Sequence, residues 1–291
     1  MESYLSAEQI ESFERDGFLV LEKFWSEETV NTLRCSIHSI LDSFDPSSSK
    51  TVFSTKEQKR KSDEYFLTSG GEIRFFWEEK AFDEDGNLQK PAAECINKVG
   101  HALHDKDPHF QKASYDPRIG RICRELGMVK PLSVQSMFIF KHAYVGGEVC
   151  PHQDGSFLYT EPQTCIGFWW ALDNCTTTNG CLWATPGSHK EGVRRRFRRK
   201  GDASEGTEFV NVADGSRNEG AENFDTSFGV PLEMPKGTLV ILHDAVVHWS
   251  EANSSPAPRY AYSIHVVDGE AKYPADNWLQ RDEPFNEISE R

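Results

Sequence analysis

A histidine and an aspartate separated by one residue, His152 and Asp154, form the sharpest chemical pattern in the sequence. If residues 150–154 form an extended strand, both side chains project from the same face, because side chains alternate along a strand. An imidazole and a carboxylate then converge on one point and can bind the same metal ion. The pattern alone is weak, since histidines in β proteins are more often hydrogen-bonded structural residues than metal ligands.

The third ligand of such a site is expected from a distant part of the chain. His248 follows a candidate strand at residues 238–242 and lies far from His152 in the sequence. Two histidines and one carboxylate on one face of an octahedral ion leave three positions open, which is the donor set of non-haem Fe(II) oxygenases. The spacing therefore predicts an Fe(II) site made of His152, Asp154 and His248.

Other residues offer competing sites. Cys150 lies two residues before His152 and could complete a Cys-His-His zinc site with His248. His101 and His104 are three residues apart on a predicted helix and could share a metal, but no nearby carboxylate or cysteine pair completes that site. We interpret both as structural or pocket-lining residues. Three further histidines are interpreted as structural: His189, His243 and His265.

An arginine, Arg259, stands eleven residues after His248 and directly before a predicted strand. A guanidinium that points into a β core is costly unless it meets an anion, and its planar fork matches a carboxylate through two hydrogen bonds. In enzymes with this metal site, the far carboxylate of 2-oxoglutarate is that anion. A surface arginine or an internal salt bridge is the alternative interpretation.

The elements that must position these side chains change in character along the chain. Hydrophobic spacing and capping residues predict mainly helices before residue 131. These helices are predicted at residues 6–13, 26–41, 96–105 and 117–126, with a short strand at 17–21. From residue 131 onward, short β-branched and aromatic runs alternate with turn residues. Candidate strands are at residues 134–140, 165–172, 181–185, 238–242 and 260–267.

This order of elements predicts one α+β domain that spans residues 1–291. Helices from residues 1–130 buttress a mainly β core at 131–270, of the antiparallel sandwich or barrel type that includes jelly rolls and cupins. A polar segment at about 201–229 is long for a loop inside a compact domain. We interpret it as a lid or mobile insertion, with a surface excursion as the alternative.

The composition narrows the class of partner. With 46 acidic and 32 basic side chains the net charge is −14, which argues against a general binder of nucleic acid or anionic membranes. No segment approaches the roughly 20 apolar residues of a membrane span. The seven cysteines contain no Cys-x-x-Cys pair, and the last residues do not match a peroxisomal signal. We therefore expect an intracellular, cytoplasmic protein with free thiols and a small-molecule substrate.

One basic run interrupts this acidity. Residues 190–200 hold seven basic side chains and one acid. The run could bind an anionic group such as a CoA phosphate or a carboxylate. We favour the alternatives, a solvated basic loop or a partner for the acidic stretch that follows.

Motifs occur in a defined order along nearly the whole chain. They are residues 9–24, Lys98-Val99-Gly100-His101-Ala102-Leu103-His104, Gln135-Ser136-Met137, Gly146-Gly147-Glu148-Val149, Pro151-His152-Gln153-Asp154, Asn179-Gly180-Cys181-Leu182, Pro186-Gly187-Ser188-His189 and Asp276-Asn277-Trp278-Leu279. Together these motifs resemble the phytanoyl-CoA dioxygenase (PhyH) family, above all its phytanoyl-CoA dioxygenase domain-containing branch. So many ordered motifs are far more specific than the metal-binding pattern alone.

The resemblance implies a double-stranded β-helix of the jelly-roll, cupin-like type. It implies Fe(II) bound by His152, Asp154 and His248, with 2-oxoglutarate and O2 as cosubstrates. Arg259 and Ser250 would then bind the far carboxylate of 2-oxoglutarate. Three further residues would line the cosubstrate pocket: Lys98, Met137 and Trp169.

The resemblance also bears on the reaction. Related halogenases carry a small residue where this chain has Asp154, so hydroxylation is favoured over halogenation. The expected reaction hydroxylates an unactivated C–H bond of a small organic or acyl substrate, with release of succinate and CO2. Anionic substrates such as an acyl-CoA or a carboxylic acid are among the candidates. A cupin-like protein that binds metal and 2-oxoglutarate without turnover is the alternative.

Overall fold

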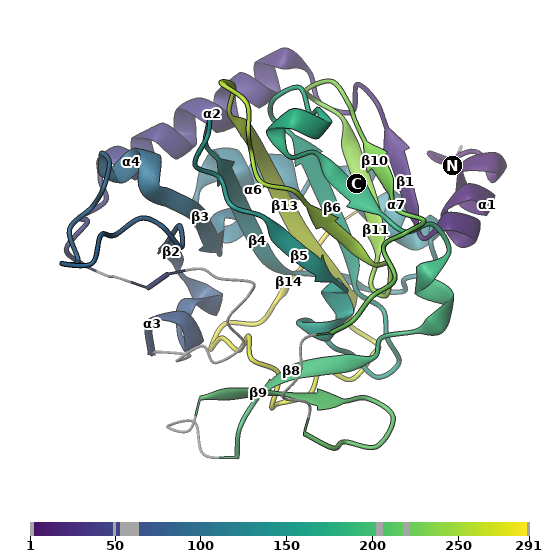
Figure 1. Ribbon diagram of the computed structural model, residues 1–291. Helices are drawn as coiled ribbons and strands as arrows, with labels where there is room; N and C mark the ends of the chain where they lie inside the picture. Colours follow the sequence, from purple (N-terminus) through teal and green to yellow (C-terminus); the bar gives the residue numbers. More distant parts are fainter. Residues whose placement is uncertain (1–2, 49–50, 53–63, 202–205, 218–221, 290–291) are drawn as a thin grey trace.

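Fourteen strands and seven α-helices occur in the part of the chain that the computed structural model describes, residues 3–48, 51–52, 64–201, 206–217 and 222–289 (Figure 1). The strands are β1 (Phe18–Leu21), β2 (Ile73–Trp77), β3 (Ile96–His101), β4 (Pro131–Lys141), β5 (Val149–His152), β6 (Ile166–Ala171), β7 (Leu182–Ala184), β8 (Arg195–Arg199), β9 (Thr207–Asn211), β10 (Val230–Leu232), β11 (Leu239–His243), β12 (His248–Ser250), β13 (Arg259–Asp268) and β14 (Asn286–Glu287). The helices are α1 (Ala7–Asp16), α2 (Glu27–Asp42), α3 (Glu64–Leu67), α4 (Ala92–Cys95), α5 (Leu103–Lys106), α6 (Pro108–Ser114) and α7 (Pro117–Glu125). Short 3-10 turns are η1 (Ser69–Gly71), η2 (Asp154–Ser156), η3 (Thr177–Asn179) and η4 (Ser188–Glu191).

The strands form a jelly roll with one large and one small antiparallel sheet. The large sheet has the order β1-β11-β6-β13-β4-β3-β2, and β14 adds to β4. The small sheet has the order β10-β7-β12-β5. β13 pairs with both β4 and β6 and is buried along its whole length. This architecture confirms the predicted mainly β, jelly-roll core.

The N-terminal segment forms a helix, α1, and then β1, an edge strand of the large sheet. The Ser6 hydroxyl accepts a hydrogen bond from the backbone N–H of Gln9, and the Gln9 side-chain oxygen accepts one from the backbone N–H of Ser6. α1 therefore begins with a capping box, as predicted. The helix ends at Gly17, whose φ of 82° is the left-handed conformation that glycine adopts without strain. Directly after it, β1 pairs with β11.

Residues before 131 contribute more β structure than the sequence predicts. The helices at α1, α2 and α7 and the strand β1 are confirmed. The helix predicted at residues 96–105 is wrong, because residues 96–101 form β3, which pairs on one side with β2 and on the other with β4. A helix begins only at Leu103. The residues before 131 therefore extend the large sheet as well as covering it.

Aromatic stacking joins this N-terminal part to the central strands. The ring centroids of Trp25 and Trp170 lie 4.3 Å apart with nearly parallel planes. Trp170 in turn stacks on Tyr262 of β13. The buried face of α2 contributes Val30, Leu33 and Ile37 to the same core.

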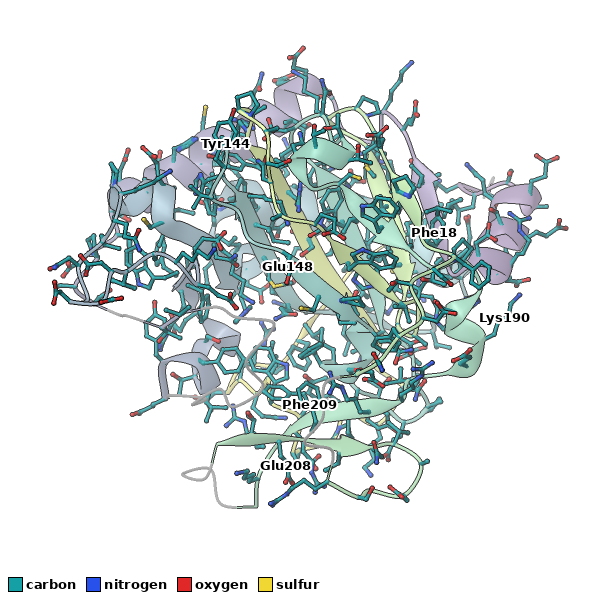
Figure 2. All side chains as sticks on the ribbon, in the orientation of Figure 1. Phe18, Tyr144, Glu148, Lys190, Glu208 and Phe209 are labelled. Carbon is teal, nitrogen blue, oxygen red and sulfur yellow. The ribbon has the colours of Figure 1, made fainter. Side chains whose placement is uncertain are left out.

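The basic run at residues 190–200 folds into η4 and β8 instead of a solvated loop. β8 pairs with β9 in a hairpin that projects from the end of the jelly roll, where Figure 2 labels Glu208 and Phe209. Two arginines of β8 contact acids that follow in the sequence: Arg195 lies 2.6 Å from Glu222, and Arg198 lies 3.0 Å from Glu208. The interpretation as a partner for the acidic stretch that follows is therefore confirmed for these residues.

The polar segment at 201–229 is structured where it is described, since it contains β9. No helix in the described ranges is long and apolar enough to cross a membrane. The seven cysteines, which all lie in the described ranges, form no disulfide.

Candidate metal centre

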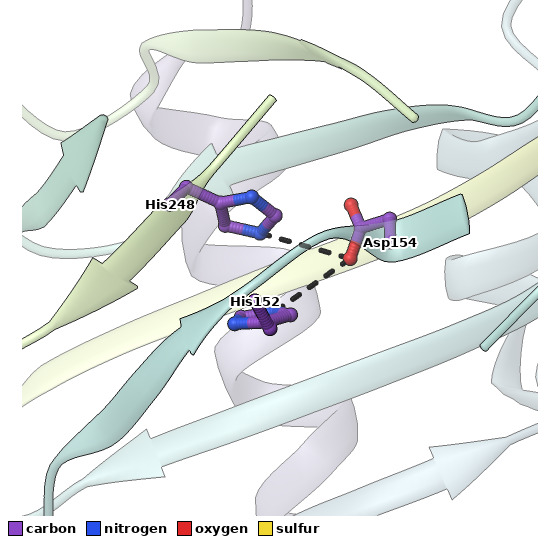
Figure 3. Close-up of side chains that lie close together, drawn as sticks. All are labelled: His152, Asp154 and His248. Carbon is purple, nitrogen blue, oxygen red and sulfur yellow. Dashed lines mark ion pairs between the residues drawn. The ribbon is translucent and has the colours of Figure 1, made fainter. Parts of the chain in front are cut away.

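Two neighbouring strands of the small sheet and the turn after one of them bring the predicted metal ligands together (Figure 3). β5 ends at His152 and β12 begins at His248, and these residues are direct partners in the antiparallel pair. Asp154 is the first residue of η2. Its Oδ1 atom lies 3.7 Å from His152 Nε2 and 3.6 Å from His248 Nε2. The three side chains singled out by spacing therefore meet at one point.

Backbone carbonyls fix how the two imidazoles are turned. His152 Nδ1 lies 2.9 Å from the Cys150 carbonyl, and His248 Nδ1 lies 3.0 Å from the Val246 carbonyl. A carbonyl only accepts, so each Nδ1 carries the proton and donates it. Each Nε2 then presents its lone pair toward Asp154, which is the tautomer that a metal-binding histidine needs.

The environment sets the protonation states that metal binding requires. Burial is the main cause that lowers the pKa of His152 to about 4, with a smaller effect from the neighbouring His248, so this imidazole is neutral at physiological pH. Burial by itself raises the pKa of Asp154, but the neighbouring His265 and His248 outweigh it and hold the pKa below its usual range. A neutral imidazole and an ionised carboxylate are the forms that bind a divalent cation.

The donor set fits a divalent transition metal such as Fe(II). One ligand atom from each of the three residues lies within 4.8 Å of the others, and within the described ranges no other histidine, cysteine and acidic side chains converge in this way. Two histidines and a carboxylate from one side leave the opposite side for other ligands. Cys150 is not part of the cluster, so the geometry offers no support for the alternative zinc site.

The competing histidines have other partners. His101 Nδ1 lies 2.8 Å from Ser69 Oγ, and His104 Nδ1 lies 2.9 Å from Ser136 Oγ, so this pair does not share a site. His189 donates from Nε2 to the Glu14 carbonyl at 3.1 Å. These contacts agree with the structural interpretation of all three residues.

His243 and His265 were also interpreted as structural from the sequence, and the structure places the two differently. His243 contacts Asp244 at 2.7 Å, outside the metal cluster. His265 differs, because its Nε2 atom lies 3.2 Å from Asp154 Oδ2. His265 therefore belongs to the surroundings of the site and is not a remote structural residue.

A pocket between the two sheets contains the triad together with all five residues expected around 2-oxoglutarate. Those five are Lys98, Met137, Trp169, Ser250 and Arg259. The remaining lining residues are Asn97, Ile139, Val149, Gly167, Phe168, Leu182, Leu242, Trp249, Ser263 and His265. The walls are thus mostly apolar, with a few polar groups concentrated near the triad and near Arg259.

Arg259 brings a buried positive charge to the pocket. Its side chain is almost fully buried, and Nε donates to the Gly180 carbonyl at 2.9 Å. Nη1 has no hydrogen-bond partner among the described residues. Burial lowers the pKa of Arg259 from its usual value, but an arginine stays charged in proteins. A buried guanidinium with an unused donor is suited to binding an anion.

The other predicted cosubstrate residues line the same pocket as this charge. The Arg259 guanidinium carbon lies 5.3 Å from the centroid of the Trp169 ring. Lys98 Nζ lies 3.6 Å from Met137 Sδ and 5.4 Å from the Phe76 ring centroid. Ser250 ends β12, the strand that begins with His248. All four expected neighbours of Arg259 therefore line the same pocket.

Sequence reasoning missed several pocket residues. His265 was identifiable, because alternation along β13 puts it on the same face as Arg259 and Ser263. Gly167 carried no signal, since its importance depends on the absence of a side chain. Asn97 lay in a segment that was predicted to be helical.

Sequence comparison places these observations in a family. The sequence model of the family described as phytanoyl-CoA dioxygenase (PhyH) matches residues 13–261. The chain belongs to the phytanoyl-CoA dioxygenase family. It is 44% identical over 278 residues to a phytanoyl-CoA dioxygenase from Arabidopsis thaliana, covering 95% of this chain and 94% of the relative. It is 43% identical to phytanoyl-CoA dioxygenase domain-containing protein 1 from Mus musculus, with 95% of each chain covered.

Solved structures of related fold are more distant in sequence. A non-heme alpha ketoglutarate dependent carbocyclase, SnoK from nogalamycin biosynthesis, superposes with a TM-score of 0.64 at 16% identity, covering 98% of this chain and 97% of the other. EctD from S. alaskensis, solved with 2-oxoglutarate and 5-hydroxyectoine, has a TM-score of 0.62 at 19% identity, covering 100% and 85%. These likenesses confirm the predicted fold. The family match confirms the resemblance and the assignment as a non-haem oxygenase.

Proposed function

We propose that this protein is an Fe(II)- and 2-oxoglutarate-dependent dioxygenase that hydroxylates an unactivated C–H bond of a small organic substrate, releasing succinate and CO2. One observation carries the proposal: the His-Asp-His cluster and a buried arginine with an unused donor share one largely apolar pocket. The pocket therefore offers both the ligands that iron requires and a positive charge that can bind one carboxylate of a dicarboxylate such as 2-oxoglutarate.

His152, Asp154 and His248 hold the iron in this proposal. When bound, Fe(II) supplies the activation of O2 and of the C–H bond, chemistry that no side chain provides. The residues of the chain contribute position and ionisation state: Cys150 and Val246 keep the two Nε2 lone pairs facing Asp154.

Arg259 receives the far carboxylate of 2-oxoglutarate, and Ser250 supplies a hydroxyl beside it. Trp169, Met137 and Lys98 shape the walls that hold the carbon chain. The apolar walls exclude water, which strengthens the attraction between guanidinium and carboxylate.

The substrate in this proposal is a small molecule, and the contacts of the basic run bear on whether that molecule is anionic. Three of the β8 arginines that were considered as an anchor for an acyl-CoA or carboxylic acid, Arg195, Arg196 and Arg198, are engaged by Glu222, Asp276 and Glu208. An anionic substrate would therefore depend on other groups. Asp154 fills the position that is small in related halogenases, which favours hydroxylation. The cytoplasmic location stays a prediction.

Anaerobic addition of Fe(II) and then 2-oxoglutarate to the purified protein tests the proposal. A weak metal-to-ligand absorption band in the visible is expected, and His152→Ala and Asp154→Ala abolish it. His38→Ala, which removes an exposed histidine of α2, leaves it unchanged.

Turnover separates the enzyme from a binding protein. O2-dependent succinate formation with a panel of acyl-CoAs, free acids and small metabolites is the measurement. A band without succinate under any condition favours the cupin-like binding protein, and no band at all contradicts the iron site.

A further inference from the structure

The two oxygens of Asp154 face different surroundings. Oδ1 is the atom near His152 and His248, at 3.7 Å and 3.6 Å from their Nε2 atoms. Oδ2 lies 3.2 Å from His265 Nε2. The carboxylate is thus divided between the metal cluster on one side and a third imidazole on the other.

A glycine makes room for this arrangement. A Cβ on Gly167 would lie 2.7 Å from Asp154 Oδ2 and 3.6 Å from His265 Cδ2, and real side chains essentially never approach an atom as closely as the first distance. Gly167 and His265 are direct partners in the β6–β13 pair. Oδ2 therefore lies against bare backbone of β6, next to the imidazole that its paired strand supplies.

The sheet holds His265 in this position. The residue lies on β13 between β4 and β6, and its side chain is buried. Its Nδ1 atom has no hydrogen-bond partner in the described part of the chain, so the approach to Asp154 is its principal polar contact. Asp154 Oδ2 is itself buried without a hydrogen-bond partner among the described residues, so the imidazole that faces it at 3.2 Å is the polar side chain placed to position it.

We infer that His265 is a positioning residue that holds Asp154 Oδ2 and leaves Oδ1 alone to bind the metal. This inference rests on the proposed function. A carboxylate that binds through both oxygens would occupy two coordination positions, whereas one oxygen keeps the opposite face open for 2-oxoglutarate and O2. Partners that orient a ligand in this way typically contribute 10–100-fold to metal affinity.

Titration of the metal-free protein with Co(II), without cosubstrate or O2, tests the inference. Co(II) is a redox-stable probe whose d–d absorption also reports coordination number. We expect His265→Ala to weaken Co(II) binding about 10–100-fold and to change the intensity of the d–d bands. His265→Gln keeps an N–H donor at a similar distance and should recover most of the affinity.

A matched control separates positioning from loss of a buried histidine. His104 is also fully buried and bound to a serine, but it lies outside the pocket. His104→Ala should lower the melting temperature without changing the Co(II) dissociation constant or spectrum.

Gly167→Ala provides a second route that leaves His265 intact. Its methyl group displaces Oδ2, so we expect weaker Co(II) binding with altered d–d bands in a folded protein. Wild-type affinity and spectrum in both His265→Ala and Gly167→Ala would overturn the inference while leaving the metal site in place. Failure of the wild type to bind Co(II), or binding that survives Asp154→Ala, would instead overturn the proposed function and this inference with it.

Discussion

At the scale of single residues, Arg259 shows how burial prepares a group for a ligand. Its guanidinium is surrounded by protein, yet Nε donates to the Gly180 carbonyl while Nη1 has no hydrogen-bond partner among the described residues. Desolvating a cation is costly unless an anion compensates for it. The pocket therefore gains stability when a carboxylate arrives, and affinity for that carboxylate should depend on the planar fork.

Replacing Arg259 should separate cosubstrate binding from metal binding. We expect Arg259→Ala to raise the KM for 2-oxoglutarate about 100-fold, in line with the loss of a charge-assisted bidentate contact. Arg259→Lys restores the positive charge but not the planar pair of donors, so its KM for 2-oxoglutarate should lie between those of the wild type and Arg259→Ala. Succinate formation measures the effect, and Co(II) affinity should stay unchanged. A wild-type KM in both variants would assign the far carboxylate to another residue.

Glu78 provides a pH-dependent contribution to stability. Burial raises its pKa from 4.5 to about 7, although hydrogen bonds from Asn97 and Gly147 oppose this shift. Between those two pH values the folded chain holds a proton that the unfolded chain has lost, so the stability contributed by Glu78 falls as the pH rises and is constant above about 7.

The variant Glu78→Gln removes this titration. The difference in unfolding free energy between Glu78→Gln and wild type should shift in favour of the variant by about 3 kcal/mol from pH 4.5 to pH 7.5. Urea denaturation of both proteins across this range measures it. A difference that does not vary with pH would show that the carboxyl is ionised normally.

Site residues that follow a local spacing pattern were predicted from the sequence, whereas the role of a residue that depends on contacts between distant segments was missed. His152 and Asp154 share a strand face, and that alternation is visible without a structure. His265 was misjudged: alternation along β13 places it on the face of Arg259, but its contact with Asp154 arises only in the folded chain. The roles proposed for Arg259 and Ser250 stay predictions until ligand binding is measured.

At the scale of elements, a buried ion pair fastens the C-terminal segment to α5. Arg281 Nη1 lies 2.6 Å from Asp105 Oδ2, and both side chains are less than a tenth exposed. Asp105 also accepts hydrogen bonds from Tyr115 and Asn286. Removing one partner leaves a buried charge without compensation.

Arg281→Ala should therefore lower the free energy of unfolding by about 3 kcal/mol. Arg15→Ala is the matched control, since Arg15 pairs with Asp16 on the exposed surface, where solvent screens the pair, and should change stability far less. Chemical denaturation compares the two. Equal effects would mean that the Asp105 pair is as well solvated as the surface pair.

The strand β3 shows why local sequence was insufficient for part of the fold. Residues 96–101 contain both strand-forming and helix-tolerant residues, and the helix prediction drew on the apolar spacing through Leu103. Pairing with β2 and β4 on both sides decides the outcome, and such long-range pairing overrides weak local preference. By contrast, β13 was predictable because its long β-branched and aromatic run suits a central strand.

At the scale of the whole molecule, N-terminal and C-terminal parts share one sheet. β1, β2 and β3 come from the first 130 residues; β1 pairs with β11 and β3 pairs with β4, and both of these partners come from the remainder. The Trp25–Trp170 stack crosses the same division. If these strand pairs and the tryptophan stack form cooperatively, the chain folds as the single domain that was predicted.

Truncation tests that prediction. We expect a fragment that begins at residue 131 to lack a cooperative unfolding transition, because it loses three strands of the large sheet and their packing. The full chain should unfold in one transition by calorimetry and near-ultraviolet circular dichroism alike. Two separable transitions in the full chain would contradict a single domain.

Two of the seven tryptophans, Trp169 and Trp249, line the pocket, while Trp25 and Trp170 stack in the core. Indole fluorescence responds to quenchers and to charge within a few ångströms, so the pocket contains its own optical reporter. Occupation by a paramagnetic ion or a dicarboxylate should dim emission from the first pair and leave the second pair as an internal reference. Ligands can thus be ranked by intrinsic emission before any product has been identified.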